Sequence, residues 1–248
     1  MISGRGDLKK AYQDDEVARE YVGRRFTTPL GRLLHSRQIR VVQQLIRQHA
    51  IRRTGEIAPG PARLTVDIAP LLHNVTLIDA SARMLLEARR RLGERGVEGR
   101  VALVQADAFA LPLDCQFDLI YTFRLIRHFE RADRQRLYRQ VASVLRRGGW
   151  LVFDAVNETV SGPLRAQANP GEYAHFDALL RPEPLAAELR ECDFDLVSLV
   201  GVQRNYPALM RCQVLLAPRS TVLARAAMEI IDRIGGEPLE WVVVCQRV

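Results

Sequence analysis

Lysine is almost absent from this chain of 248 residues, in which Lys9 and Lys10 are the only two. Arginine therefore supplies nearly all of the positive charge behind the formal net charge of +7 at pH 7. A positive net charge alone is compatible with a nucleic-acid partner. The arginines, however, are spread along the polar side of helical patterns, and no DNA-binding or RNA-binding module accompanies them. We therefore interpret most of them as solvated helix faces.

Closely spaced cysteines, long apolar runs and an apolar leader are also missing. No apolar run approaches the roughly 20 residues that a membrane-spanning helix needs. The first residues, MISGRGDLKKAYQDDE, lack the apolar segment of a secretory signal, which favours a cytoplasmic location. The four cysteines are too far apart for a zinc knuckle and give no reason to propose disulfides. We expect buried free thiols and no metal site from Cys115, Cys192, Cys212 and Cys245.

What the chain does contain is a regular alternation of short apolar runs and amphipathic helical patterns. Runs such as VTLIDA, FDLIYTF and WLVFDAV are separated by helix-like segments such as ARMLLEARRRL. This alternation predicts an α/β fold with a doubly wound, mostly parallel sheet that is covered by helices on both faces. Seven strands are expected, and no linker, repeat or low-complexity tract divides the chain.

Two helical predictions are specific enough to test. The pattern RADRQRLYRQVASVLRR predicts a helix that is ended by Gly148-Gly149, with a strand following at once. Between the last two strands, residues 205–236 carry one further amphipathic helix. Its apolar face is expected to consist of Leu223, Ala227, Ile230, Ile231 and Ile234.

The stretch EIAPGPARLT, residues 56–65, follows the first strand of the alternation. In a doubly wound sheet, ligands bind at the carboxyl ends of the strands, and Gly60 lets a ligand come close to the backbone. Small residues also stand at Ala58 and Ala62, which does not reproduce the dinucleotide pattern G-x-G-x-x-G. The two intervening prolines remove amide donors and stiffen the loop, so it is poorly suited to wrapping a pyrophosphate.

Three successive strands end in an acidic residue or are followed by one. Glu56 belongs to the loop just described, and Asp79 ends the second strand, where a carboxylate can accept hydrogen bonds from both hydroxyls of a ribose. The alternative for Asp79 is to cap the following helix. Asp107 follows the third strand and is a candidate acceptor for an adenine amino group, with Met84 and Phe109 as apolar walls.

In this order the motifs resemble those of the class I S-adenosylmethionine (SAM)-dependent methyltransferases, over essentially the whole chain. EIAPGPARL resembles their first motif, LIDASARML their second, and VQADAFALPL the segment that holds adenine. FDLIYTFRLIRHFE is similar to the fourth-strand motif that faces the methyl group, and LRRGGWLVFDAVN to the glycine turn before the fifth strand. The chain departs from the family at the first and third glycines of the first motif, which are replaced by Ala58 and Ala62.

The resemblance implies SAM as cofactor and an antiparallel last strand inserted beside the sixth. It also implies a helical cap over residues 1–50, a cofactor-binding core over 51–160 and a substrate-side segment over 161–248. The implied cofactor-binding residues are Tyr12, Tyr21, Arg25, Glu56, Ala58, Gly60, Asp79, Ala80, Met84, Asp107, Ala108, Phe109 and Thr122.

Methyl transfer from a sulfonium depends on alignment, and a general base is needed only if the acceptor must lose a proton. Candidates at the mouth are Arg124, Arg127 and His128 after the fourth strand, and His175 after the fifth. We predict His128 as the base and Arg124 as the group that orients an anionic part of the substrate or the SAM carboxylate. The alternatives are a structural histidine and a surface arginine.

The sequence favours methylation of a small-molecule or lipid-like acceptor, at oxygen, nitrogen or carbon. This preference follows from the lack of a separate RNA-binding module. Three competing functions remain at this point: methylation of RNA, transfer of another group from SAM, and binding of SAM without catalysis.

Overall fold

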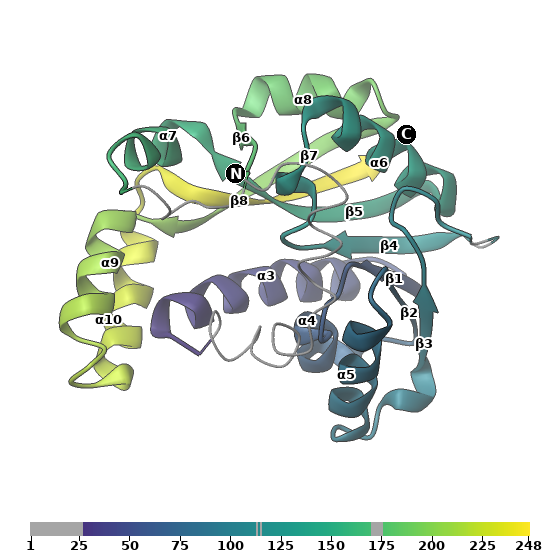
Figure 1. The fold of residues 1–248 in the computed structure, drawn as a ribbon, viewed down its shortest axis with the longest axis horizontal. Coiled ribbons are helices and arrows are strands. Elements are labelled where there is room, and N and C mark those ends of the chain that lie inside the picture. The colour runs from purple at the N-terminus through teal and green to yellow at the C-terminus, as the bar shows by residue number, and fades with distance from the viewer. Residues whose placement is uncertain (1–26, 113, 115, 170–175) are drawn as a thin grey trace.

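The structure is a computed structural model that describes residues 27–248, except 113, 115 and 170–175 (Figure 1). The predicted helix around AYQDDEVAREYVGRRF therefore lies outside the described residues. The strands are β1 (Arg53–Ile57), β2 (Asn74–Asp79), β3 (Val101–Gln105), β4 (Phe117–Thr122), β5 (Leu145–Asn157), β6 (Leu179–Leu180), β7 (Phe194–Arg204) and β8 (Pro238–Arg247). The α-helices are α3 (Pro29–Gln48), α4 (Arg63–Ile68), α5 (Ala82–Gly93), α6 (Arg131–Val144), α7 (Glu158–Ala166), α8 (Pro182–Arg190), α9 (Tyr206–Leu215) and α10 (Thr221–Ile234).

The strands form one sheet in the order β3-β2-β1-β4-β5-β8-β7. The first five strands of this order are parallel, whereas β8 runs antiparallel to both β5 and β7. The two-residue strand β6 pairs with the end of β5 and is an addition to the seven predicted strands. The doubly wound fold and its antiparallel last strand are thus confirmed. The strand order reverses between β1 and β4, which is where ligands of such sheets bind.

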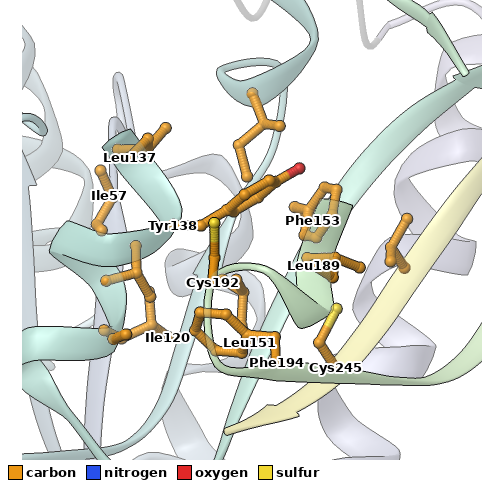
Figure 2. Packing of buried hydrophobic residues seen from close by; sticks show 14 of the residues in the cluster. Ile57, Ile120, Leu137, Tyr138, Leu151, Phe153, Leu189, Cys192, Phe194 and Cys245 are labelled. Atoms are coloured by element: carbon orange, nitrogen blue, oxygen red, sulfur yellow. The ribbon is translucent and has the colours of Figure 1, made fainter. Parts of the chain in front are cut away.

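Helices cover both faces of the sheet, each over its own apolar core. In Figure 1, α6 and α8 lie above the sheet, and α3, α4 and α5 lie below it. The upper core includes Tyr138 of α6, Leu189 of α8 and Phe153 of β5, all fully buried, as Figure 2 shows. The lower core joins Val42 of α3 to Leu119 of β4, whereas the next residue of that strand, Ile120, belongs to the upper core. Alternate residues of one strand therefore face different cores, as in a parallel sheet covered on both sides.

Two helices begin at residues that commonly start or cap helices. Pro29 stands in the first turn of α3, where its missing amide is not needed, and the Thr28 hydroxyl accepts a hydrogen bond from the Gly31 amide at 3.1 Å. In the same way, Ser81 caps α5 by accepting a hydrogen bond from the Met84 amide at 3.3 Å. Ser81 therefore takes the capping role that was the alternative reading of Asp79.

The end of α6 differs from the prediction. The helix ends at Val144, and Leu145 already has extended backbone as the first residue of β5. The pairing of β4 with β5 then slips, since Phe117 pairs with Leu145 but Leu119 pairs with Trp150. The glycine pair lies in this irregular stretch, where Gly148 has a φ of 71°. The glycines thus shape a bulge at the start of β5 and do not end the helix.

The insertion before β8 also differs from the prediction, because it forms two helices, α9 and α10, in place of one. Helix α10 buries Ala224 and Met228, while Leu223, Ile230 and Ile234 of the predicted apolar face are each more than half exposed. Of the predicted apolar face, only Ala227 and Ile231 are half-buried, and Ile231 packs against the core of Leu33, Leu209 and Met228. The helix is also fixed by Arg37 of α3, whose guanidinium donates to Asp232 at 2.8 Å and to Glu229 at 2.9 Å.

Within the described part of the chain, no helix combines the length and the apolar character needed to cross a membrane.

Candidate active site

A cavity of about 370 Å³ opens at the carboxyl ends of β1, β2 and β4. Its size falls in the range of small-molecule sites. The sequence predictions converge here, because most of the predicted residues line it. Those residues are Glu56, Ala58, Gly60, Asp79, Ala80, Met84, Asp107, Ala108, Phe109, Arg124 and His128.

The loop after β1 forms one wall of the cavity. Ala58, Gly60 and Ala62 all have left-handed backbone, with φ of 52°, 55° and 52°. A side chain added at Gly60 would meet only the Met84 sulfur, at 3.9 Å, so glycine is favoured there by its left-handed backbone and not by a lack of space. The loop is tied to the neighbouring strand by the Gly60 amide, which donates to Asp79 Oδ2 at 3.1 Å.

Asp79 stands at the end of β2 and faces the cavity. Its other oxygen, Oδ1, accepts a hydrogen bond from the Ser81 amide at 2.8 Å. Burial raises the pKa of Asp79, and the two amide hydrogen bonds oppose that effect. Each carboxylate oxygen has a second lone pair, so Asp79 retains the capacity to accept hydrogen bonds from a diol.

Asp107 is exposed at the far end of the cavity. Its Oδ1 accepts a hydrogen bond from the Phe109 amide at 3.0 Å, which fixes the turn after β3. The Phe109 ring packs edge-on against Phe129, with the ring centroids 5.0 Å apart. Together with Met84, Phe109 gives the cavity apolar walls, as predicted for a bound base.

Glu56 is a buried carboxyl at the base of the cavity. Its partners are hydroxyl groups: Thr65 donates a short hydrogen bond to Glu56, and Thr65 Oγ1 also lies 2.6 Å from the Tyr121 hydroxyl. Burial raises the pKa of Glu56 to about 8, despite the opposing hydrogen bond from Thr65. A carboxyl in this state favours a cationic ligand, because a nearby positive charge stabilises its ionised form.

His128 lines the cavity from the short 3₁₀ turn after β4. Its Nδ1 lies 2.9 Å from the Phe176 carbonyl oxygen and 3.0 Å from Asp177 Oδ1. Since a carbonyl oxygen can only accept, Nδ1 carries the proton and Nε2 has a lone pair in the neutral ring. Nε2 is buried and has no hydrogen-bond partner. The ring is thus held with an unused acceptor at the cavity wall.

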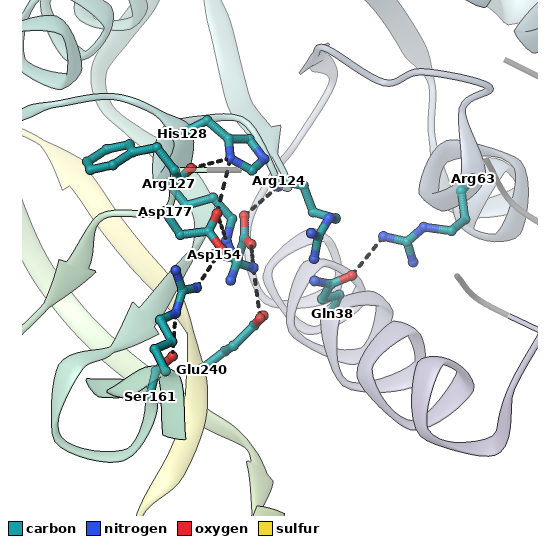
Figure 3. A network of polar contacts seen from close by, with 11 residues as sticks. Gln38, Arg63, Arg124, Arg127, His128, Asp154, Ser161, Asp177 and Glu240 are labelled. Atoms are coloured by element: carbon teal, nitrogen blue, oxygen red, sulfur yellow. Dashed lines mark hydrogen bonds and ion pairs between the residues drawn. The ribbon is translucent and has the colours of Figure 1, made fainter. Parts of the chain in front are cut away.

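Behind His128 lies a group of buried charges that we call the Arg127 cluster (Figure 3). It consists of Arg127, Asp154, Asp177, Glu240 and Arg165. Arg127 is only 3% exposed, and its guanidinium donates to Asp154 at 3.0 Å, to Glu240 at 2.7 Å and to Asp177 at 3.1 Å. Arg165 holds the other oxygen of Asp177 at 2.6 Å.

Asp177 is the link between this cluster and the cavity. Burial alone would raise its pKa, but the hydrogen bond with His128 and the charge of Arg127 hold the pKa of Asp177 well below its usual range. Asp177 therefore stays ionised and is placed to stabilise a protonated His128. The Arg127 side chain, by contrast, is fully engaged in the cluster and is unsuited to the role at the mouth that its position in the sequence indicated.

Two arginines lie at the cavity opening. Arg124 has left-handed backbone, with a φ of 64°, and its amide donates to Asp154 at 2.6 Å. Its side chain points toward α3 in Figure 3, and its Nε is buried without a partner. Arg63, at the start of α4, donates to Gln38 of α3 at 2.8 Å. Both arginines line the cavity and are suited to binding an anionic group.

The remaining predicted residues are not brought to the cavity by the described structure. Thr122 is buried in β4, 1% exposed, and is not among the lining residues. Tyr12, Tyr21, Arg25 and His175 lie outside the described residues.

Sequence reasoning missed Arg63, Thr65 and Asp177. Arg63 and Thr65 belong to the EIAPGPARLT stretch itself. Polar side chains that directly follow a ligand-binding loop are candidates for the site, so the sequence could have indicated both. Asp177 lies beside the histidine that was considered in EYAHFD, but its pairing with His128 spans 49 residues of sequence and has no local signature.

Comparison with known proteins gives a consistent result. Residues 56–149 match the family model described as "Methyltransferase domain". The chain is 24% identical over 175 residues to a ubiquinone biosynthesis O-methyltransferase of Bordetella avium, covering 66% of this chain and 70% of the relative. It is 38% identical over 104 residues to a ubiquinone/menaquinone biosynthesis C-methyltransferase of Azotobacter vinelandii, but that match covers only 40% of each chain.

Solved structures show the same fold at low sequence identity. Magnesium protoporphyrin IX methyltransferase from Synechocystis, solved with bound S-adenosylhomocysteine (SAH), superposes with a TM-score of 0.71 and 11% identity, covering 99% of this chain and all of that one. The [4+2]-cyclase SpnF superposes with a TM-score of 0.58 and 19% identity, covering 84% and 81%. Because the second protein is named for a different reaction, the fold alone does not determine the chemistry.

The cavity residues fit the cofactor of this family. Asp79 retains acceptors for a ribose, Gly60 leaves the backbone accessible, and buried Glu56 favours a cationic ligand. SAM carries both a ribose and a positive charge. The matched domain over residues 56–149, the sheet order and this fit support SAM as the cofactor and a likeness to the class I SAM-dependent methyltransferases.

Proposed function

We propose that the chain transfers a methyl group from SAM to a hydroxyl oxygen of a small-molecule or lipid-like acceptor. The observation that carries the choice of oxygen is His128, whose Nδ1 is held by Phe176 and Asp177 while its buried Nε2 has no partner. A hydroxyl must lose a proton to become methylated, and a positioned base assists that loss. The Bordetella relative, named as an O-methyltransferase, supports this choice and makes quinone precursors the first acceptors to try.

In this proposal the cofactor lies along the carboxyl ends of β1, β2 and β3. Asp79 accepts hydrogen bonds from the ribose, and Asp107 accepts one from the adenine amino group between the walls made by Met84 and Phe109. Gly60 permits close approach along the loop, and Ala58, Ala80 and Ala108 keep the remaining walls small. Glu56 faces the positively charged end of the cofactor.

When bound, SAM supplies a methyl group activated by a positively charged sulfur. The residues of this chain supply position and proton transfer. His128 takes the hydroxyl proton at Nε2, and ionised Asp177 stabilises the resulting imidazolium. The Arg127 cluster fixes Asp177, so the base is oriented before the acceptor arrives. Arg124 binds an anionic group of the acceptor or the SAM carboxylate, since both fit an unpaired guanidinium nitrogen.

Replacement of Asp79 by alanine tests the cofactor site. The variant loses two hydrogen bonds to a charged acceptor, each worth roughly 1.5–3 kcal/mol, so we expect the Kd for SAM to rise at least about a hundredfold. Calorimetric titration with SAM and with SAH measures this change. Asp195→Ala, on the exposed side of β7, is the matched control and should leave both affinities unchanged. Wild-type affinity in a folded Asp79→Ala protein would refute the ribose assignment.

A further inference from the structure

The hairpin formed by α9 and α10 exposes an unusual amount of apolar surface. Of the eleven large apolar side chains that are exposed among the described residues, seven fall between positions 214 and 234. Each of the seven is more than a third exposed, and Figure 1 shows the hairpin projecting from the body of the molecule beside the start of α3. The seven are Val214, Leu215, Leu216, Val222, Leu223, Ile230 and Ile234, which we call the hairpin patch.

The hairpin patch is separate from the face by which the hairpin is attached. The attached face is a small core in which Met228 of α10 packs with Leu33 of α3 and Leu209 of α9. Leu223, Ile230 and Ile234 follow the spacing of one helix face and lie away from that core. The helix therefore has two apolar faces, and packing against α3 accounts for only one of them.

Charge identifies what the second face binds. The hairpin carries four exposed arginines, Arg211, Arg219, Arg225 and Arg233. Its only acidic residues are Glu229 and Asp232, and both are bonded to Arg37 of α3, although Glu229 also lies 3.7 Å from Arg233. A helical hairpin with an exposed apolar row and several exposed arginines has the composition of a segment that lies in the interface of a bilayer, where cations meet anionic headgroups.

The same charges disfavour a second copy of this chain as the occupant. A symmetric dimer through the hairpin patch places the four arginines of one copy against the four of the other, and like charges across an interface repel. Nucleic acid satisfies the arginines but leaves the apolar side chains in water. A surface of anionic lipid satisfies both.

We propose that the α9–α10 hairpin docks on the surface of a membrane that contains anionic lipid, with the hairpin patch in the interface and the arginines at the headgroups. Helix α3 connects this surface to the cavity. Arg37 of α3 bonds to the hairpin, and the next residue, Gln38, bonds to Arg63 at the cavity wall. In this arrangement, α3 lies between the docked hairpin and the cavity wall.

Co-sedimentation of the full chain with lipid vesicles tests this proposal. The wild type should bind vesicles of phosphatidylcholine and phosphatidylglycerol, mixed at roughly three parts to one, and bind pure phosphatidylcholine more weakly. The double variant Leu223→Ser, Ile230→Ser should lower the partition coefficient about tenfold or more on both vesicles. Arg219→Gln with Arg225→Gln should lower it about fivefold per arginine, only where phosphatidylglycerol is present.

Matched controls come from other parts of the surface. Leu86 of α5 is 62% exposed, and Arg136 of α6 is also exposed, so Leu86→Ser and Arg136→Gln should bind vesicles as the wild type does. Thermal unfolding checks that each variant is folded. The proposal is overturned if the wild type binds neither vesicle or if the hairpin variants bind like the controls. It is also overturned if sedimentation equilibrium shows that Leu223→Ser, Ile230→Ser converts a dimer to a monomer while vesicle binding is unchanged.

Discussion

Two carboxylates at the cavity have opposite surroundings. Glu56 is buried among hydroxyl groups, and burial raises its pKa to about 8. Asp177 is also largely buried, yet His128, Arg127 and Arg165 hold its pKa well below the usual range. The Glu56 end of the cavity, to which we assign the cofactor, therefore has no cation among the described residues that stabilises the ionised carboxylate, and a cationic ligand would supply one. The Asp177 end, to which we assign the acceptor, is neutralised by arginines of the chain itself, so its geometry does not depend on a ligand.

The largest expected effect is a loss of stability when Arg127, the centre of the Arg127 cluster, is replaced. Arg127→Met removes the cation shared by Asp154, Asp177 and Glu240 and leaves buried carboxylates unpaired, which costs about 3–5 kcal/mol of unfolding free energy. Urea denaturation measures the loss. Arg181→Met is the matched control, because the pair of Arg181 with Glu158 is exposed and contributes about 1 kcal/mol or less. Equal stability of the two variants would contradict the structural importance of the cluster.

A smaller effect is expected when only the proton acceptor is removed. His128→Ala should lower kcat for a hydroxyl acceptor about a hundredfold, equivalent to about 2.7 kcal/mol, while the calorimetric Kd for SAM changes little. His73→Ala, at an exposed histidine after α4, serves as the control. Near-normal turnover of His128→Ala would mean that alignment alone accounts for catalysis.

The most gradual expected effect is a pH dependence of stability that comes from Glu56. Without ligand, Glu56 binds its proton more tightly in the folded chain than its ordinary value of 4.5 allows, so wild-type stability should fall as pH rises from about 5 to about 8. The slope is at most about 1.4 kcal/mol per pH unit. Glu56→Gln should remove the contribution of Glu56 and leave only that of Asp79, whose pKa is raised as well, as measured by urea denaturation across this range.

Asp177→Asn provides the opposite control for that slope. The stability contributed by Asp177 is present above its ordinary value of 3.8 and is lost only as pH falls toward its lower folded pKa. Asp177 itself does not titrate between about pH 5 and about pH 8, so its substitution should leave the slope caused by Glu56 in place there. If Glu56→Gln behaves in the same way, the two ends do not differ as described.

The sequence correctly predicted that acidic residues from three strand ends line one cavity, because local pattern suffices there. Parallel strands bring their carboxyl ends to one edge, so the acidic residues Glu56, Asp79 and Asp107 were placed from their order in the chain alone. The same reasoning failed for Thr122, whose position in β4 points it into the buried interior. The sequence locates the end of a strand to within one or two residues, but an error of one residue moves a side chain to the opposite face of the sheet.

The acceptor end depends on contacts that local pattern does not contain. Arg127 joins residues of β5, β8 and the segment before β6, up to 113 positions apart, and only the folded sheet brings them together. In α10 the pattern correctly predicted an apolar face. The buried face is the one that carries Asp232, because this residue bonds to Arg37, 195 positions away.

The loop from Ala58 to Ala62 has a consequence for how the site is occupied. Ala58 and Ala62 adopt left-handed backbone, a conformation that costs an alanine roughly 1–2 kcal/mol more than it costs a glycine. In exchange, the alanines and the two prolines between them leave the loop few other shapes to adopt. A ligand arriving here meets a surface that is already ordered, so little of its binding free energy is lost to conformational entropy. The cost of ordering this loop is thus met when the chain folds, and ligand binding does not have to supply it.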